Sequence, residues 1–206
     1  MTTDQIIKRH LDDNYKIDII LEHNDILPFV RENLKPSNLI TLLFYFITIS
    51  GFIILLGVVI SQSLTLGIFH AIISLILGIV STIFLIPIHE GVHAIAYKIC
   101  GAKSIQFGVN WKQLYFTASA HHYLAGYKEL FFVGLSPFLA INIAGLFLLF
   151  AVSHQYSIGL LSCLAFHNVM CAGDFGILSY FFQNRKSSPL TFDDVSEARS
   201  FFLIKE

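Results

Sequence analysis

The chain has 206 residues, of which 55% are hydrophobic and only 13% are charged. Soluble domains carry about 25% charged residues, so the composition indicates an integral membrane protein rather than a soluble one. The formal net charge of −1 shows no basic excess, and nucleic acid is therefore not an expected partner.

Four apolar stretches are long enough to cross a bilayer as helices, which requires about 20 residues each. They cover residues 39–60, 66–86, 130–152 and 158–182. The second stretch continues as a helix through IPIHEGVHAIAYKICG, which starts at Ile86. We therefore predict an all-α integral membrane protein with about four transmembrane helices.

The segments outside these stretches give the expected domain organisation. Residues 1–38 form an N-terminal segment, 39–182 a membrane-embedded domain and 183–206 a C-terminal tail. Lysine and arginine occur in both terminal segments and in the central loop between the second and third stretches, but not in the connections SQSLT and SHQYS. Because positively charged loops stay on the inner side of the membrane, we expect a multi-pass cell-membrane protein whose two termini and central loop are cytoplasmic.

The central loop contains an alternating pattern that is typical of strands. In KSIQFGVNWKQLYFTAS, apolar residues alternate from Phe107 to Trp111 and again from Leu114 to Ala118, with a break at residues 110–113. This pattern predicts a short β-hairpin at the cytoplasmic face. An irregular amphipathic loop is the alternative.

The motif HEGVH, from His89 to His93, has the spacing of a metal site. Residues four apart lie on one face of a helix, one turn apart, so the two imidazoles can bind the same ion. Glu90 is rotated away from that direction and can reach a water on the ion without being a ligand. This is the HExxH arrangement of zinc peptidases, in which the glutamate accepts a proton from a metal-bound water as that water attacks a carbonyl.

A zinc peptidase needs a third protein ligand and leaves the fourth position to water. Asp174, in FHNVMCAGDFGIL, is the only acidic residue of the four predicted helices besides Glu90. At about 1.5 Å per residue, the two histidines lie about 13 and 8 Å from the charged end of their helix at Lys98, and Asp174 lies about 16 Å from Arg185. These similar depths predict Asp174 as the third ligand.

Other histidines are rivals for this place. His167 lies on the same helix as Asp174 but two turns deeper, where a hydrogen-bonded core histidine is the simpler interpretation. His121 and His122 belong to the central loop and could fold back over the site, although loop histidines are more often solvated or interfacial.

Two asparagines lie within the third and fourth stretches. Asn142 and Asn168 could each hydrogen-bond a substrate carbonyl or the oxyanion that forms from it. The alternative for both is a hydrogen bond between helices, which is a common role of polar side chains in apolar bundles.

These residues resemble those of a known group. HEGVHA, SIQFGVNWKQLYF, LSP and HNVMCAGD are similar to sequences of the membrane zincin peptidases of bacteria, which are in turn similar to the site-2 protease class of intramembrane metalloproteases. The resemblance covers about residues 85–182 and implies His89 and His93 as zinc ligands. It also implies Glu90 as the catalytic base and Asp174 as the third ligand. The site-2 class usually has an Asn-Pro-Asp-Gly type of sequence around this aspartate, whereas no proline adjoins it here.

Together these observations predict a membrane-embedded zinc metalloendopeptidase that cleaves membrane-associated peptides near the cytoplasmic face by metal-activated water. Its expected partners are the lipid bilayer and a membrane-associated peptide or protein substrate. The alternative is a non-proteolytic zinc-binding membrane scaffold or partner-binding protein, which would need the ligands but not Glu90. A transporter is disfavoured, because the helices carry no charge beyond the proposed site.

Overall fold

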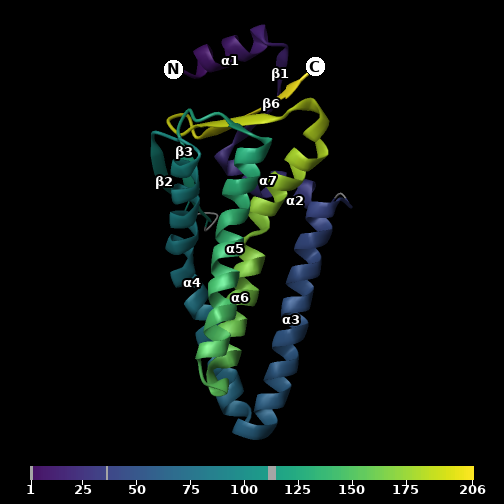
Figure 1. Ribbon diagram of the computed structural model, residues 1–206, viewed down its shortest axis with the longest axis vertical. Coiled ribbons are helices and arrows are strands. Elements are labelled where there is room, and N and C mark those ends of the chain that lie inside the picture. The colour runs from purple at the N-terminus through teal and green to yellow at the C-terminus, as the bar shows by residue number, and fades with distance from the viewer. Residues whose placement is uncertain (1, 36, 111–114) are drawn as a thin grey trace.

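The computed structural model describes residues 2–35, 37–110 and 115–206. Figure 1 shows an elongated molecule in which long helices run side by side and a small sheet lies at one end. Both chain termini lie at this end, which we call the sheet end. The protein is mostly helical, as predicted from the sequence.

The helical bundle consists of α3 (Leu39–Leu66), α4 (Ile68–Ile99), α5 (Tyr127–Ala151), α6 (Ser157–Met170) and α7 (Ala172–Gln183). Within the described ranges, three of these helices, α3, α4 and α5, are long and apolar enough to cross a membrane. Helices α6 and α7 pass the same test together, as a pair bent by 42°. The fourth predicted stretch is therefore present, but it is broken at Cys171 instead of running straight.

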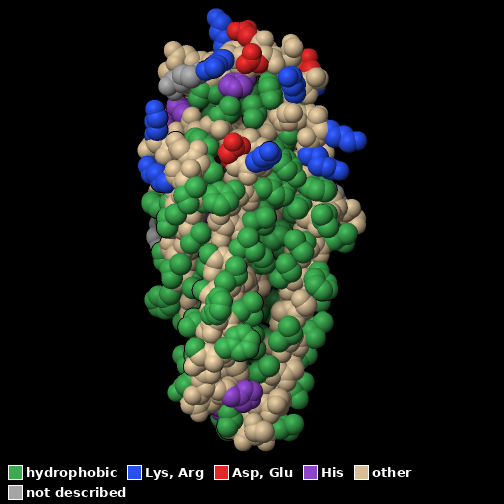
Figure 2. Space-filling model, in the orientation of Figure 1, with side chains coloured by type: hydrophobic (Ala, Val, Ile, Leu, Met, Phe, Trp, Pro, Cys, Tyr) green, Lys and Arg blue, Asp and Glu red, His purple; other side chains and the backbone are tan. Residues whose placement is uncertain are grey.

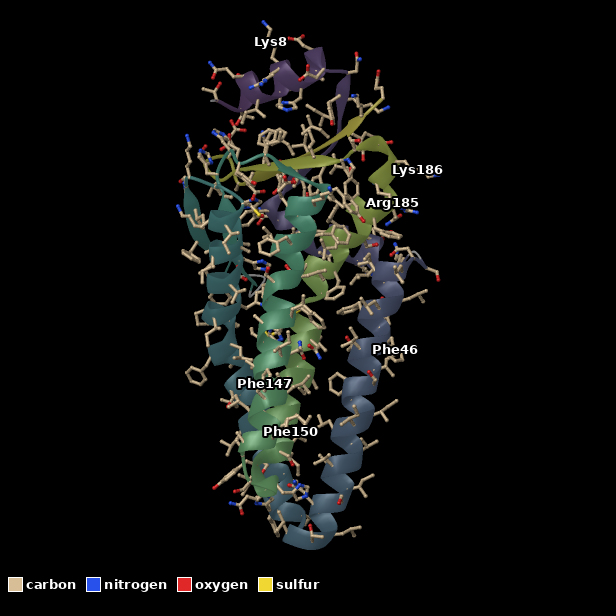
Figure 3. The ribbon with its side chains drawn as sticks, viewed as in Figure 1. Lys8, Phe46, Phe147, Phe150, Arg185 and Lys186 are labelled. Carbon is tan, nitrogen blue, oxygen red and sulfur yellow. The ribbon has the colours of Figure 1, made fainter. Side chains whose placement is uncertain are left out.

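The outer surface of the bundle is apolar. Phe46, Phe147 and Phe150 project outward from α3 and α5, with 70%, 72% and 89% of their surface exposed (Figure 3). On the face drawn in Figure 2, hydrophobic side chains cover the length of the bundle, whereas lysine and arginine gather at the sheet end. Such a large apolar surface is suited to an apolar surrounding and not to water.

Close packing of α4 against α6 depends on Gly78. A Cβ atom at this position would overlap the carbonyl oxygen of Gly159 and the hydroxyl of Ser162. In apolar helix bundles, small residues of this kind let backbones approach closely and gain packing and hydrogen-bond energy. Ser162 uses this approach to donate a hydrogen bond to the carbonyl of Leu75 (3.3 Å). The contact fixes the distance between the two helices that carry the histidines of the site described below.

We expect Gly78→Val to destabilise the protein, because α4 and α6 can admit the new side chain only by moving apart. Overpacking of a well-packed core costs about 1–3 kcal/mol, and contact with backbone atoms places this change at the upper end. The matched control is Gly57→Val on α3, where an added Cβ meets nothing within 4 Å. Thermal unfolding of both variants in detergent micelles measures the difference, and equal melting temperatures would contradict the assigned role of Gly78.

A four-stranded antiparallel sheet closes the sheet end, in the order β1-β6-β5-β4. Its strands are β1 (Tyr15–Glu22), β4 (Ala125–Gly126), β5 (Leu190–Asp194) and β6 (Arg199–Lys205). Helix α1 (Thr3–Asp12) packs on one face of the sheet, while α2 (Ile26–Leu34) and α7 pack on the other. The sequence predicted only the hairpin of the central loop, so this sheet is an addition to the predicted all-α fold.

Burial on both faces explains why β6 was not predicted. Phe201 and Leu203 pack in the cluster below α1, and Phe202, between them in sequence, contacts Phe29 and Tyr180 on the opposite face. A strand covered on both sides lacks the alternation of polar and apolar residues that identifies a half-exposed strand. The segment was therefore predicted to be part of a C-terminal tail and not a strand.

The predicted hairpin is present. Strands β2 (Ile105–Asn110) and β3 (Tyr115–Ala120) pair antiparallel, and β3 also contacts α4. Trp111 and Leu114, which belong to the predicted pattern, lie outside the described residues. The described residues also include the short 3₁₀ helices η1 (His23–Asp25), η2 (His154–Tyr156) and η3 (Arg185–Ser187).

Candidate metal centre

The two histidines of HEGVH lie on one face of α4, as their spacing predicts. The Nε2 atoms of His89 and His93 are 3.1 Å apart, and both side chains are buried. Two uncharged imidazoles that face each other without a shared proton or ion gain little from this arrangement. Their geometry is that of two ligands directed at one point.

Asp174 lies at the same point. It belongs to the first turn of α7, and the bend at Cys171 turns this end of the helix toward α4. One carboxylate oxygen lies 3.1 Å from Nε2 of His93, and the other lies 3.3 Å from Nε2 of His89. The structure thus brings together the three residues that the sequence analysis proposed as ligands.

The spacing of these atoms fits a zinc ion. Ligand atoms about 2.0–2.2 Å from a tetrahedral zinc lie roughly 3.3–3.6 Å from one another. The separations between His89, His93 and Asp174 are 3.1–3.3 Å, so a small outward shift would accommodate the ion. Two imidazoles and one carboxylate leave the fourth position for water, as in catalytic zinc sites.

The remaining ring nitrogens of the two histidines are held by other parts of the bundle. When Nε2 faces the centre, Nδ1 carries the proton and needs an acceptor. Nδ1 of His93 donates to the carbonyl oxygen of Val133 on α5 (3.1 Å). Nδ1 of His89 donates to Nε2 of His167 on α6 (3.1 Å). Such partners fix the tautomer and the orientation of a metal-binding imidazole.

The sequence favoured a hydrogen-bonded core histidine at position 167, and the structure agrees, because His167 is fully buried and hydrogen-bonded; that its partner is His89 was not foreseen. Depth estimates along a straight helix placed His167 two turns beyond Asp174. The ring of His89 nevertheless reaches His167, because His89 lies one turn deeper than His93 and an imidazole extends several ångströms from its helix. The signal that could have revealed this contact was the position of His167 within an apolar span, on the same deeper side of the site as His89.

We expect His167→Leu to weaken zinc binding about 10–100-fold, as is typical when the partner of a metal-binding histidine is lost. Glutamine at this position retains a hydrogen-bond acceptor, so His167→Gln should recover a large part of the affinity. Competition with a chromophoric chelator measures both values. Equal affinities for the two variants would show that His167 acts only by filling space.

Glu90 lies beside the three ligands but does not belong to their cluster. The backbone N–H of Ala118 in β3 donates a hydrogen bond to its carboxylate. The carboxylate is half-buried between the hairpin and the centre. This is the position of a group that can exchange a proton with a water at the open ligand position.

Asn142 and Asn168 contact each other. Nδ2 of Asn142 donates to Oδ1 of Asn168 (2.8 Å) and to the carbonyl of Phe138 (2.8 Å). Asn168 is buried, and the pair joins α5 to α6. This contact is the hydrogen bond between helices that the sequence analysis kept as the alternative to an oxyanion role.

His121 and His122, the rivals from the central loop, are placed elsewhere. They lie at the sheet end beside Asp194, and not with His89 and His93.

The fold and the centre together define a class. A bundle of long apolar helices carries an HExxH helix, a carboxylate from a separate helix lies within 3.3 Å of both histidines, and a glutamate stands beside them; such groups are the components of a zinc metallopeptidase.

The chain belongs to a family described as "putative zincin peptidase", whose sequence profile matches residues 82–189. The matched region contains the HEGVH motif, Asp174 and His167, and membership of a zincin family implies zinc as the metal. Neither a curated protein nor a solved structure matches the chain.

Proposed function

We propose that this protein is a membrane-embedded zinc endopeptidase that hydrolyses peptide bonds of membrane-associated substrates close to the cytoplasmic face. The observation that carries the proposal is the convergence of His89, His93 and Asp174 on one point with Glu90 beside them. A purely structural site would need the ligands but would gain nothing from a half-buried carboxylate next to them.

The residues divide the chemistry between them. A zinc ion bound here would polarise a peptide carbonyl and lower the pKa of its bound water. Glu90 would act as the general base and acid, taking a proton from the attacking water and passing it to the leaving amine. The hydrogen bond from Ala118 orients the Glu90 carboxylate for this transfer. Val133 and His167 hold the imidazoles in the tautomer that leaves Nε2 available to the metal.

The distribution of charge supports the proposed orientation. The basic residues Lys8, Arg185 and Lys186 all lie at the sheet end (Figure 3). Under the positive-inside rule this end faces the cytoplasm, and residues 39–182 form the membrane-embedded domain between the two terminal segments. The centre then lies within the inner half of the bilayer, because His89 and His93 precede the end of α4 by about 15 and 9 Å.

We propose that the substrate approaches along the outside of α4 and α5. Val92 and Ala96 on α4 and Phe131 and Leu135 on α5 line an apolar groove of about 570 Å³ that is open to the outside of the bundle. A membrane-associated peptide has an apolar surface of the kind that fills such a groove. The groove therefore supports entry of the substrate from the bilayer.

Hydrolysis also requires an extended substrate, because a helical backbone keeps its carbonyls in hydrogen bonds. The N–H of Ala118 points to Glu90, so the edge of β3 opposite β2 faces the centre. A peptide added along this edge would bring its backbone next to Glu90. We propose that the substrate binds at this edge as an added strand.

Purified protein in lipid vesicles should cleave a single-span reporter peptide, lose this activity when a chelator removes the metal and regain it when zinc is added back. A variant with a shortened β2–β3 hairpin should bind zinc normally but cleave poorly. If the zinc-loaded protein leaves a broad panel of membrane peptides intact, the scaffold function becomes the better explanation. Normal cleavage by the shortened variant would remove strand addition from the mechanism.

A further inference from the structure

A second cluster of potential metal ligands lies at the sheet end, apart from the bundle. His121 and His122 follow β3, and Asp194 is the last residue of β5. Each of the three offers a ligand atom within 4.8 Å of the other two. Nε2 of His122 is 3.3 Å from Oδ2 of Asp194, which is a separation expected of two ligands of one zinc ion.

The backbone places both imidazoles on one side of the chain. In an extended chain, consecutive side chains point in opposite directions. His122 has a φ of +54°, in the left-handed region that residues other than glycine rarely adopt. The rings of His121 and His122 are consequently stacked, with centroids 3.8 Å apart and planes inclined by 27°. A costly backbone conformation that pairs two ligand side chains is a sign of function.

Asp194 directs one oxygen at these rings. Its Oδ1 atom is occupied by the backbone N–H of Ser196 (3.0 Å) and of Glu197 (3.3 Å), and by the hydroxyl of Ser196. Its Oδ2 atom faces His122 and also receives a hydrogen bond from the hydroxyl of Thr3 in α1. The hydrogen bonds from Ser196 and Thr3 hold the Asp194 carboxylate in this orientation beside His122.

We propose that His121, His122 and Asp194 form a second binding site for a divalent transition-metal ion of the zinc type, separate from the centre in the bundle. Two imidazoles and one carboxylate suit zinc and its neighbours in the first transition row better than calcium or magnesium. Thr3 would not be a ligand, but the hydrogen bond from its hydroxyl would hold the carboxylate oxygen of Asp194 in position. Binding requires local changes at both histidines, since Nδ1 of His121 now accepts a hydrogen bond from the N–H of Val195 (3.2 Å) and the hydroxyl of Thr3 lies 2.9 Å from Nε2 of His122.

This site would join three parts of the sheet end. The histidines belong to the segment after β3, Asp194 to the end of β5, and Thr3 to α1. The backbone of His122 already donates to the carbonyl of Asp193 (2.9 Å), so the ion would strengthen an existing contact. Because β3 also holds Glu90 through Ala118, the ion would fix the strand beside the catalytic carboxylate.

The test is the amount of zinc bound by the full-length purified protein, measured by elemental analysis after equilibration at micromolar free zinc. We expect two equivalents for the wild type and one for the double variant His121→Gln/His122→Gln. The double variant His89→Ala/His93→Ala should also retain one equivalent. The variant His154→Gln, at the opposite end of the bundle, is the control for loss of a histidine and should bind two.

The outcomes separate this proposal from the proposed function. One equivalent in the wild type that disappears with His89 and His93 would overturn the second site and leave the peptidase centre intact. One equivalent that disappears with His121 and His122 would support the second site and refute the centre in the bundle. If the glutamine variant does not fold, cobalt titration of the wild type decides, because two sites give two spectral phases and a single phase overturns the proposal.

Discussion

Replacement of Glu90 by glutamine should abolish peptide hydrolysis and leave metal binding unchanged. Glutamine has nearly the same shape as glutamate but cannot accept the proton of a metal-bound water. Loss of a general base typically lowers the rate about 10²–10⁴-fold, which would bring cleavage of a membrane reporter close to the background. Reporter cleavage and zinc content measured on the same preparation give the two readouts.

The control for this substitution is Glu32→Gln, which removes an exposed carboxylate at the surface of α2. It should leave both cleavage and zinc content at the wild-type level. Normal hydrolysis by the Glu90→Gln protein would show that another group accepts the proton. A fall in its zinc content would show that Glu90 is a ligand and would require a different assignment of the centre.

Replacement of Asp174 by alanine should remove the metal from the bundle. The carboxylate contacts Nε2 of both His89 and His93, and it supplies the only negative charge of the three-residue ligand cluster. We expect a loss of zinc affinity well beyond the roughly 10–100-fold that follows from loss of a supporting hydrogen bond. Asp174→Asn retains one carbonyl oxygen and should bind more tightly than the alanine variant but less tightly than the wild type.

Zinc affinity is measured by chelator competition, with the second site disabled by His121→Gln/His122→Gln so that only one centre is observed. Asp12→Ala, an exposed aspartate on α1, serves as the matched control. Wild-type affinity in the Asp174→Ala protein would refute the assignment of Asp174 as the third ligand. Thermal unfolding without metal shows whether the variant remains folded.

The local part of the centre could be predicted because its geometry depends on one helix. A spacing of four residues places His89 and His93 on one face of α4 wherever that helix packs. The proximity of Asp174 required a further argument, since it depends on how two helices align. The apolar surroundings made that argument possible, because the predicted helices contain so few charged residues that only one carboxylate was available to pair with the motif.

The parts that escaped prediction depend on contacts between distant segments. The bend at Cys171 contains no proline, and the polar residues near it, His167, Asn168 and Asp174, did not by themselves indicate a break, so the sequence suggested one straight span. The sheet joins β1, near the N-terminus, to β6, near the C-terminus, and nothing local reveals such a pairing. The role of His167 follows from the packing of α6 against α4, which the sequence does not specify.

The bend between α6 and α7 has a mechanical consequence. Helix α7 is attached to the sheet layer, because Tyr180 and Phe181 pack on Phe202 of β6. The histidines belong to α4, which packs mainly within the bundle. A cation bound by His89, His93 and Asp174 would therefore link α4 of the bundle to α7 and to the sheet layer on which α7 packs. Detachment of the sheet layer and release of the ion then become a single coupled equilibrium, whose position shifts with the free zinc concentration.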